Sequence, residues 1–216
     1  EELKLTYENV YMELPEGIQL HAWWFPAKEA TQEKGYVLFL HGNAENISTH
    51  TGSVVWLVEE GYEVFALDYR GFGKSTGAPD LQGALIDIRK GYEWVISNNT
   101  ENQQNVFILG QSLGAALTLS FASHSSGLAE HINGIIVDAG FSSFRGIAHE
   151  KLNDVWLTWP FQYPLSWLIP SQYDSNEYLA NIAPIPLLII QSKNDRVIPF
   201  HHGLSIYQQA SEPKEF

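Results

Sequence analysis

The sequence predicts an α/β fold in which helices cover both faces of a doubly wound, mostly parallel sheet. Short apolar runs, rich in Val, Ile and Leu, recur at long intervals, and none of them contains a charged residue. Runs of this length and composition suit strands that are buried on both faces of a parallel sheet. Segments with helical spacing lie between these runs, and strands that alternate with helices form right-handed βαβ units.

The first strands are expected at the start of the chain, where residues 7–14 and 18–25 alternate between apolar and polar side chains. A Pro-Glu-Gly sequence separates the two stretches, so they predict an antiparallel hairpin at the edge of the sheet. The buried strands are expected at residues 36–40, 64–67, 106–109, 135–137 and 187–190.

Three helices are predicted between these strands, at 54–58, 81–95 and 113–121, because their apolar residues recur on one helical face. Gly61 is well placed to end the first helix. Residues 141–183 contain no convincing strand but are rich in Trp, Tyr and Phe. A connection of this length usually carries function, and we expect a small, mostly helical cap here.

The composition is that of a globular protein, and several functions are excluded. The 216 residues are expected to form one domain, since no repeat or Gly/Ser linker divides them. A net charge of -13 argues against nucleic acid and anionic membranes as partners. The absence of cysteine excludes disulfides, thiolate metal sites and thiol catalysis. No metal-ligand cluster or phosphate-binding Gly-rich loop is found, so no metal and no cofactor are expected.

The location of the protein is less constrained. No apolar run approaches the roughly 20 residues that cross a bilayer, and no signal peptide opens the chain. The chain begins with Glu1 rather than Met, so we expect residues upstream, and a membrane tether is expected only there. A cytoplasmic location is the default, with membrane anchoring or export as alternatives.

Ser112 is the candidate nucleophile. It stands in the sequence Gly-Gln-Ser-Leu-Gly at 110–114, directly after an apolar strand and directly before a helix. A nucleophile elbow needs this context, because the serine occupies a sharp, strained turn that leaves no room for bulky neighbours two positions away. Gly110 and Gly114 meet this requirement, and the turn places the hydroxyl at the positive end of a helix.

An oxyanion hole is expected beside Ser112, because the tetrahedral acyl intermediate needs N–H donors. The backbone N–H of Leu113 is one expected donor. The second is expected in the loop that follows the strand at 36–40, with the Asn43 N–H as the candidate and Gly42 allowing a close approach to substrate. His41 is interpreted as a structural histidine whose ring holds this loop.

Four segments together resemble the α/β-hydrolase superfamily. They are His-Gly-Asn-Ala-Glu-Asn at 41–46, Asp-Tyr-Arg-Gly-Phe-Gly-Lys-Ser at 68–75, Gly-Gln-Ser-Leu-Gly at 110–114 and Asn-Asp-Arg-Val-Ile-Pro at 194–199. The resemblance runs from about residue 7 to the end, and it includes bacterial serine hydrolases and eukaryotic α/β-hydrolase-domain proteins. It implies the α/β-hydrolase fold and a serine hydrolase activity, but it does not identify the substrate. The segment at 68–75 is interpreted as structural, with Arg70 paired to a neighbouring carboxylate.

The resemblance also implies that Asp195 is the acid of a catalytic triad, which orients a histidine and stabilises its cationic form. A carboxylate at the C-terminal end of a parallel strand faces the same crevice as Ser112. Asp138, at the end of the strand at 135–137, is the alternative acid. The preferred reading is Asp195.

A general base is the missing part of this triad, because an unassisted serine hydroxyl is a weak nucleophile. In α/β-hydrolases the order along the chain is serine, acid, histidine. Only His201 and His202 follow Asp195, and they come too soon, at the expected start of a helix. We therefore expect the catalytic histidine beyond Phe216 in a longer native chain. The alternatives are a substitute histidine, with His149 in the cap as a candidate, or an inactive relative.

The favoured function is hydrolysis of a carboxylic ester or thioester, with a small-molecule acyl compound as substrate and an acyl-Ser112 intermediate. The aromatic cap is expected to wall an apolar acyl pocket, unless it only covers the sheet edge. Peptide or amide hydrolysis by the same fold is the second reading. A binding protein built on a hydrolase scaffold, without catalysis, is the third.

Overall fold

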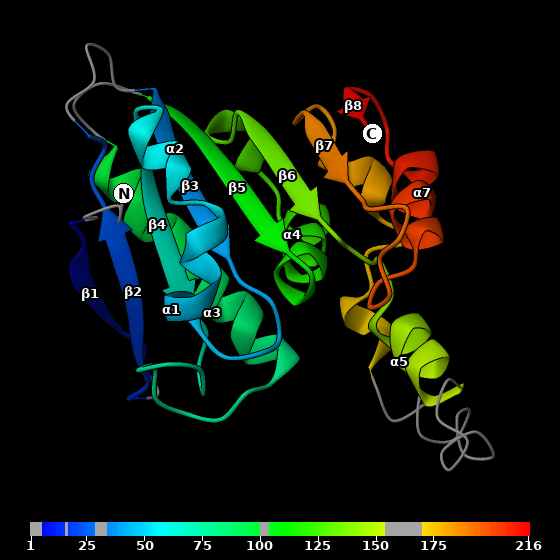
Figure 1. Ribbon diagram of the computed structural model, residues 1–216, viewed down its shortest axis with the longest axis horizontal. Coiled ribbons are helices and arrows are strands. Elements are labelled where there is room, and N and C mark those ends of the chain that lie inside the picture. Colours follow the sequence, from blue (N-terminus) through cyan, green and yellow to red (C-terminus); the bar gives the residue numbers. More distant parts are fainter. Residues whose placement is uncertain (1–5, 16, 29–33, 100–103, 154–169) are drawn as a thin grey trace.

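The computed structural model describes residues 6–15, 17–28, 34–99, 104–153 and 170–216. One eight-stranded sheet runs through these residues, with the strands in the order β1-β2-β4-β3-β5-β6-β7-β8 (Figure 1). Their bounds are β1 Glu8–Glu13, β2 Gln19–Phe25, β3 Gly35–Leu40, β4 Tyr62–Asp68, β5 Asn105–Gln111, β6 Gly134–Asp138, β7 Leu187–Ile190 and β8 Lys214–Glu215. Each strand that the sequence predicts is present, and β8 is added after the last of them.

The N-terminal hairpin forms the antiparallel edge of the sheet, as predicted. β1 pairs antiparallel with β2, and β2 pairs antiparallel with β4. All pairings from β4 through β3, β5, β6 and β7 to β8 are parallel. The C-terminal ends of β3, β5, β6 and β7 therefore meet at one edge, where ligands bind in open α/β sheets.

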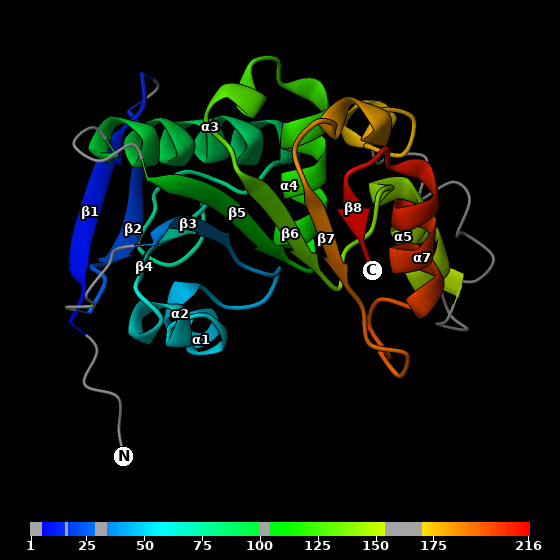
Figure 2. The same ribbon diagram turned by 90° about the horizontal axis from the view of Figure 1, so that it is seen from above.

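Helices lie on both faces of the sheet (Figure 2). One face carries α3 (Leu81–Asn98) and α4 (Leu113–His124), and the other carries α1 (Ile47–His50) and α2 (Trp56–Glu59). The helix predicted at 54–58 is thus one part of a broken segment, with a 3₁₀ turn at Thr51–Ser53 between α1 and α2. Helix α7 (Phe200–Gln209) joins β7 to β8.

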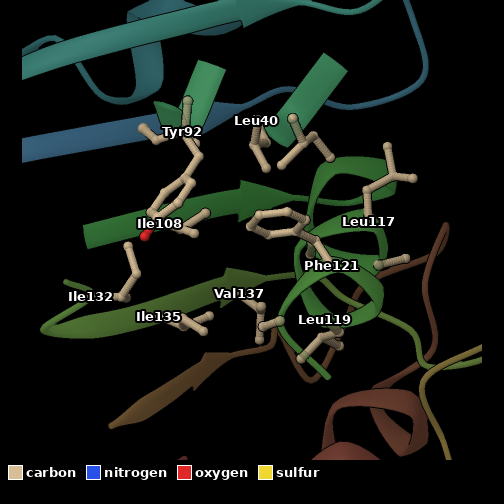
Figure 3. Close-up of a cluster of buried hydrophobic side chains, with 14 of the residues drawn as sticks. Leu40, Tyr92, Ile108, Leu117, Leu119, Phe121, Ile132, Ile135 and Val137 are labelled. Carbon is tan, nitrogen blue, oxygen red and sulfur yellow. The ribbon is translucent and has the colours of Figure 1, made fainter. Parts of the chain in front are cut away.

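The larger core fills the space between the sheet and helices α3 and α4. Figure 3 shows side chains from both helices and from β5 and β6 meeting there. Tyr92, Ile108, Phe121 and Val137 belong to this one hydrophobic cluster. Ile108 and Val137 are fully buried. The N-terminal end of α4, where Ser112 lies, is anchored by this packing.

On the opposite face of the sheet, helices cover β3 and β4 but leave β7 exposed, which corrects one expectation. All six residues of β3 are buried, but in β7 Leu188 and Ile190 are 36% and 48% exposed. The sequence predicted that strands of this kind are buried on both faces. In the part of the chain that the structure describes, α1 and α2 cover β3 and β4, while no helix lies over β7 on that face.

Between β6 and β7, the described residues form α5 (Phe144–Asn153) and two short 3₁₀ helices at Ser171–Tyr173 and Leu179–Ile182. The expected cap at 141–183 falls partly on residues 154–169, which lie outside the described residues together with Trp156, Trp159, Phe161, Tyr163 and Trp167. The Tyr178 ring packs against His124 at the end of α4 in a tilted arrangement, with ring centroids 4.7 Å apart. No helix among the described residues is both long and apolar enough to span a bilayer.

Candidate active site

Ser112 occupies a sharp turn between β5 and α4. Its φ of 53° and ψ of −112° lie in a region that residues with a Cβ rarely adopt. Such strain costs on the order of 1–3 kcal/mol and persists only where the surroundings impose it. The Ser112 N–H donates to the carbonyl oxygen of Asp138 at 2.8 Å, and the Ser112 carbonyl accepts from Ala116 in the first turn of α4. The turn is therefore held from both sides.

The two glycines of the motif allow β3, β5 and α4 to approach one another. A Cβ at Gly110 would collide with the Gly114 carbonyl oxygen and the Thr118 hydroxyl. A Cβ at Gly114 would collide with the backbone carbonyl of Leu40, at the end of β3. Glycine at these two positions is thus a packing requirement, and it brings the loop after β3 close to Ser112.

The loop after β3 lies directly beside Ser112. A Cβ built on Gly42 would be 3.6 Å from the Ser112 Cβ, so Gly42 and Ser112 are in van der Waals range. Asn46 ends the loop and caps α1, with its side chain accepting from the Ser48 N–H at 2.9 Å. Asn43 is exposed within this loop.

The two residues expected to supply oxyanion donors line one cavity. Asn43 and Leu113 both contribute to a cavity of about 240 Å³, and Phe72, Leu81 and Leu117 supply apolar parts of its wall. A small apolar group bound here would lie next to both residues. The distances from their N–H groups to a substrate oxygen depend on a ligand, so the oxyanion hole stays a prediction.

His41 is completely buried beneath this loop. Its Nδ1 contacts the Gly42 carbonyl oxygen at 2.7 Å, and its ring packs on Tyr69 with centroids 4.7 Å apart. Burial lowers the pKa of His41 to about 4, although the Gly42 carbonyl and Asp68 act in the opposite direction. A neutral, enclosed imidazole suits the interpretation of His41 as a residue that shapes the loop.

The segment after β4 is fixed by a buried ion pair. The Arg70 guanidinium donates to the Asp87 carboxylate at 2.7 Å, and the Arg70 backbone N–H donates to the same group at 2.8 Å. Asp87 is 0% exposed. This is the carboxylate partner that the sequence predicted for Arg70, so the arginine has a structural role.

Asp195 lies in the loop between β7 and α7, beyond the C-terminal end of β7. Its Oδ1 accepts from the Val197 and Ile198 backbone N–H groups at 2.7 and 2.9 Å. Its Oδ2 is 3.4 Å from the Gln191 Nε2. The carboxylate is half-buried and oriented by its own loop, with one oxygen taken up by two backbone donors.

Asp138, the alternative acid, belongs to a chain of side-chain contacts across the sheet edge. Its Oδ2 accepts from the Gln111 amide nitrogen at 3.1 Å, and the Gln111 amide oxygen lies 3.2 Å from His50 Nδ1. The other His50 nitrogen, Nε2, lies 2.8 Å from the Ala44 carbonyl oxygen. The carboxylate of Asp138 therefore already has a partner next to Ser112.

His50 is a residue near the site that sequence reasoning missed. A Cβ on Gly42 would lie 3.2 Å from His50 Cε1 as well as close to Ser112. Both ring nitrogens lie within hydrogen-bond distance of an oxygen, Nδ1 of the Gln111 amide oxygen and Nε2 of the Ala44 carbonyl oxygen, so the ring is held by contacts other than Ser112. No pattern in the sequence indicates this position, because the contacts of His50 join segments that are distant along the chain.

The histidines after Asp195 are engaged with the cap segment. His201 and His202 each place Nε2 at 3.1 Å from one oxygen of Glu150, on α5. Burial, the largest single cause, acts to raise the pKa of Glu150, but the hydrogen bonds and charges of His202 and His201 together outweigh it and lower that pKa. His149, the substitute base considered from the sequence, precedes Glu150 on the same helix.

Comparison with known proteins gives a consistent result. A family model described as serine aminopeptidase, S33, matches residues 31–176. The protein YfhR of Escherichia coli (strain K12) is 34% identical over 209 residues, which is 96% of this chain and 69% of YfhR. The α/β-hydrolase domain-containing protein WAV2 of Arabidopsis thaliana is 25% identical, over 97% of this chain and 68% of WAV2.

A solved structure extends the likeness to the whole fold. The Pyrococcus furiosus esterase Pf2001 superposes with a TM-score of 0.72 at 21% identity, covering 96% of this chain and 78% of the esterase. At this level of identity the likeness concerns the fold alone. The fold is that of the α/β hydrolases, as the four sequence segments predicted.

Proposed function

The chain belongs to the serine aminopeptidase (S33) family of α/β hydrolases, and from this premise we propose that it cleaves carboxylic esters or thioesters through an acyl-Ser112 intermediate. The observation that carries the proposal is the turn at Ser112. Its positive φ, the tightly packed glycines and the cavity lined by Asn43 and Leu113 are features that a nucleophile elbow with an oxyanion hole requires.

In this mechanism the Ser112 Oγ attacks the acyl carbon while a histidine takes its proton. The Leu113 and Asn43 N–H groups donate to the oxygen that becomes negative. The tetrahedral intermediate collapses, and the histidine returns the proton to the leaving alcohol or thiol. Water then attacks the acyl-serine in the same way, which releases the acid and restores Ser112.

Asp195 is proposed as the residue that orients this histidine, in preference to Asp138. Two backbone N–H groups on Oδ1 fix the orientation of the Asp195 carboxylate, as a residue that orients a histidine requires, whereas the Asp138 carboxylate is bound by the Gln111 side chain. The histidine itself is proposed to follow Phe216. One observation supports this: His50, His201 and His202 all contact other groups.

The size of the apolar cavity beside Asn43 and Leu113 supports a substrate with a small acyl group. Its volume of about 240 Å³ lies below the roughly 300–1,000 Å³ of pockets that hold drug-sized ligands. We therefore place a short acyl chain against Phe72, Leu81 and Leu117. The five cap aromatics outside the described residues remain a predicted second wall.

The test compares p-nitrophenyl acetate and butyrate hydrolysis by this chain and by a version extended to the length of YfhR. We expect strong ester hydrolysis only from the extended version, lost in Ser112→Ala and retained in the control Ser126→Ala, whose serine is exposed. Extended protein without turnover of either ester, nor of a butyryl thioester, would contradict the proposal.

Amide hydrolysis is the second candidate, favoured by the family description as serine aminopeptidases. Aminoacyl p-nitroanilides separate the two candidates in the same assay. Faster turnover of the anilides than of the esters would assign the protein to the peptidases. If the folded extended protein hydrolysed none of these substrates, the result would favour a non-catalytic binding protein.

A further inference from the structure

Three side chains of types that can ligate a metal, Glu150 on α5 and His201 and His202 on α7, lie close together. His201 Nε2 is 3.1 Å from Glu150 Oε1, and His202 Nε2 is 3.1 Å from Glu150 Oε2. The three ligand atoms all lie within 4.8 Å of one another. Figure 2 shows both helices on the β8 side of the sheet.

The spacing of these atoms suits a transition metal. With metal–ligand distances of about 2.0–2.2 Å, ligand atoms around a tetrahedral ion are separated by roughly 3.3 Å. The two N–O separations of 3.1 Å, one to each oxygen of Glu150, are close to this value. Two imidazoles and one carboxylate are a ligand set that zinc enzymes use, with further positions left for water.

The three side chains differ in exposure, so that one ligand is held in place by packing and another is open to ions from solvent. The His202 side chain is 11% exposed, so its ring is fixed by packing, whereas that of His201 is 62% exposed. The Glu150 side chain is 36% exposed. The two rings lie with centroids 4.4 Å apart and planes 31° apart, and both Nε2 atoms face the Glu150 carboxylate. An ion reaching the site from solvent meets His201 first.

We propose that Glu150, His201 and His202 bind one divalent transition-metal ion, with Zn²⁺ as the best match. Each imidazole then keeps its proton on Nδ1 and gives its Nε2 lone pair to the ion, while the carboxylate contributes an oxygen. The ion replaces two hydrogen bonds with coordinate bonds and ties α5 to α7. Because α7 directly follows the Asp195 loop, the site links that loop to the segment between β6 and β7.

Isothermal titration of the untagged 216-residue chain with ZnCl₂ tests the site directly and does not depend on hydrolysis. We expect one-to-one binding and a Tm that rises by about 5–10 °C at a hundredfold excess over Kd. His201→Ala is the main variant, since its exposed side chain is not needed for folding. Loss of an outer-shell partner already weakens metal sites by about 10- to 100-fold, so loss of this ligand is expected to weaken binding at least tenfold.

Two further variants keep the result decisive. Glu150→Gln preserves the size of the side chain but removes the anionic ligand, and it is also expected to lose at least tenfold in affinity. His131→Ala removes an exposed histidine elsewhere and is expected to bind Zn²⁺ as the unmodified chain does. No binding to the unmodified chain, or equal affinity in His201→Ala and His131→Ala, overturns the proposal and leaves a hydrogen-bonded clamp.

Metal selectivity gives an independent readout. Co²⁺ is expected to bind and to give the visible absorption of a low-symmetry, nitrogen-containing site, which His201→Ala abolishes. Mg²⁺ and Ca²⁺ prefer sets of oxygen ligands and are expected to leave the Tm unchanged. Equal stabilisation by Mg²⁺ would show a general effect of charge on this acidic chain and would contradict a transition-metal site.

Discussion

Phe39 and Leu188 occupy the same cross-strand row of the sheet, yet their surroundings differ completely. Phe39 in β3 pairs with Leu109, Leu109 with Ile136, and Ile136 with Leu188 in β7. Side chains paired across parallel strands point to the same face. Phe39 is 0% exposed under α1 and α2, whereas Leu188 is 36% exposed.

This difference separates the two halves of the candidate site. The loop after β3 follows a strand that is buried on both faces, and the turn at Ser112 is held by the packing of α4 against the sheet. Asp195 follows β7, which is packed from one face among the described residues, and its carboxylate is positioned by hydrogen bonds within its own loop. The nucleophile side is thus held by the core, and the acid side by local contacts.

The largest expected effect is the loss of activity when Asp195, in the loop after β7, loses its charge. In the extended protein, Asp195→Asn is expected to lower kcat about 10³- to 10⁴-fold, because a neutral amide leaves the histidine unoriented and its cation unstabilised. Asp138→Asn is expected to cost much less. Rates of p-nitrophenyl butyrate hydrolysis measure both, and the reverse ranking would make Asp138 the acid.

The direct test of the comparison uses two truncations in the same row. Phe39→Ala is expected to destabilise the 216-residue chain by about 3–5 kcal/mol, since it removes a fully buried ring and leaves a cavity. Leu188→Ala is expected to cost about 1 kcal/mol or less, because part of its surface is already in water. Urea unfolding measures both, and similar costs would mean that β7 is as well packed as β3.

Strand positions were predictable, but this contrast was not. Runs such as Leu-Leu-Ile-Ile at 187–190 indicate a strand, yet they do not show whether another element covers each face. The glycines around Ser112 were predictable because the turn itself requires them. The contacts of His50 with Gln111, and of Glu150 with His201 and His202, join distant segments, and no spacing in the sequence indicates them.

A pH effect is expected from the packed side of the site. The pKa of His41 is about 4 in the folded protein, below 6.5 for a free histidine, so the unfolded chain binds more protons between these pH values. The contribution of His41 to the free energy of unfolding is therefore fully present above pH 6.5. It is lost as the pH decreases toward 4, by roughly 3 kcal/mol. Urea unfolding at several pH values measures this loss, and His41→Gln is expected to reduce it. An unchanged pH dependence in His41→Gln would show that His41 is not the cause.

The smallest expected effect concerns strain at the nucleophile. Ser112→Gly is expected to raise the free energy of unfolding by about 1 kcal/mol, because the relief of a positive φ exceeds the entropy cost of glycine. Ser126→Gly serves as the control, since residue 126 is exposed and is not among the residues with positive φ. It is expected to lose stability by up to about 1 kcal/mol. Equal losses in both variants would mean that the core imposes no strain at Ser112.

The central claim is that the turn after β5 presents an activated nucleophile, and covalent labelling of the extended protein tests it most directly. A fluorophosphonate probe, followed by peptide mass spectrometry, is predicted to give one adduct per chain, on Ser112, that is absent from Ser112→Ala and present in Ser126→Ala. An unlabelled folded protein, or an adduct on another serine, would contradict this account.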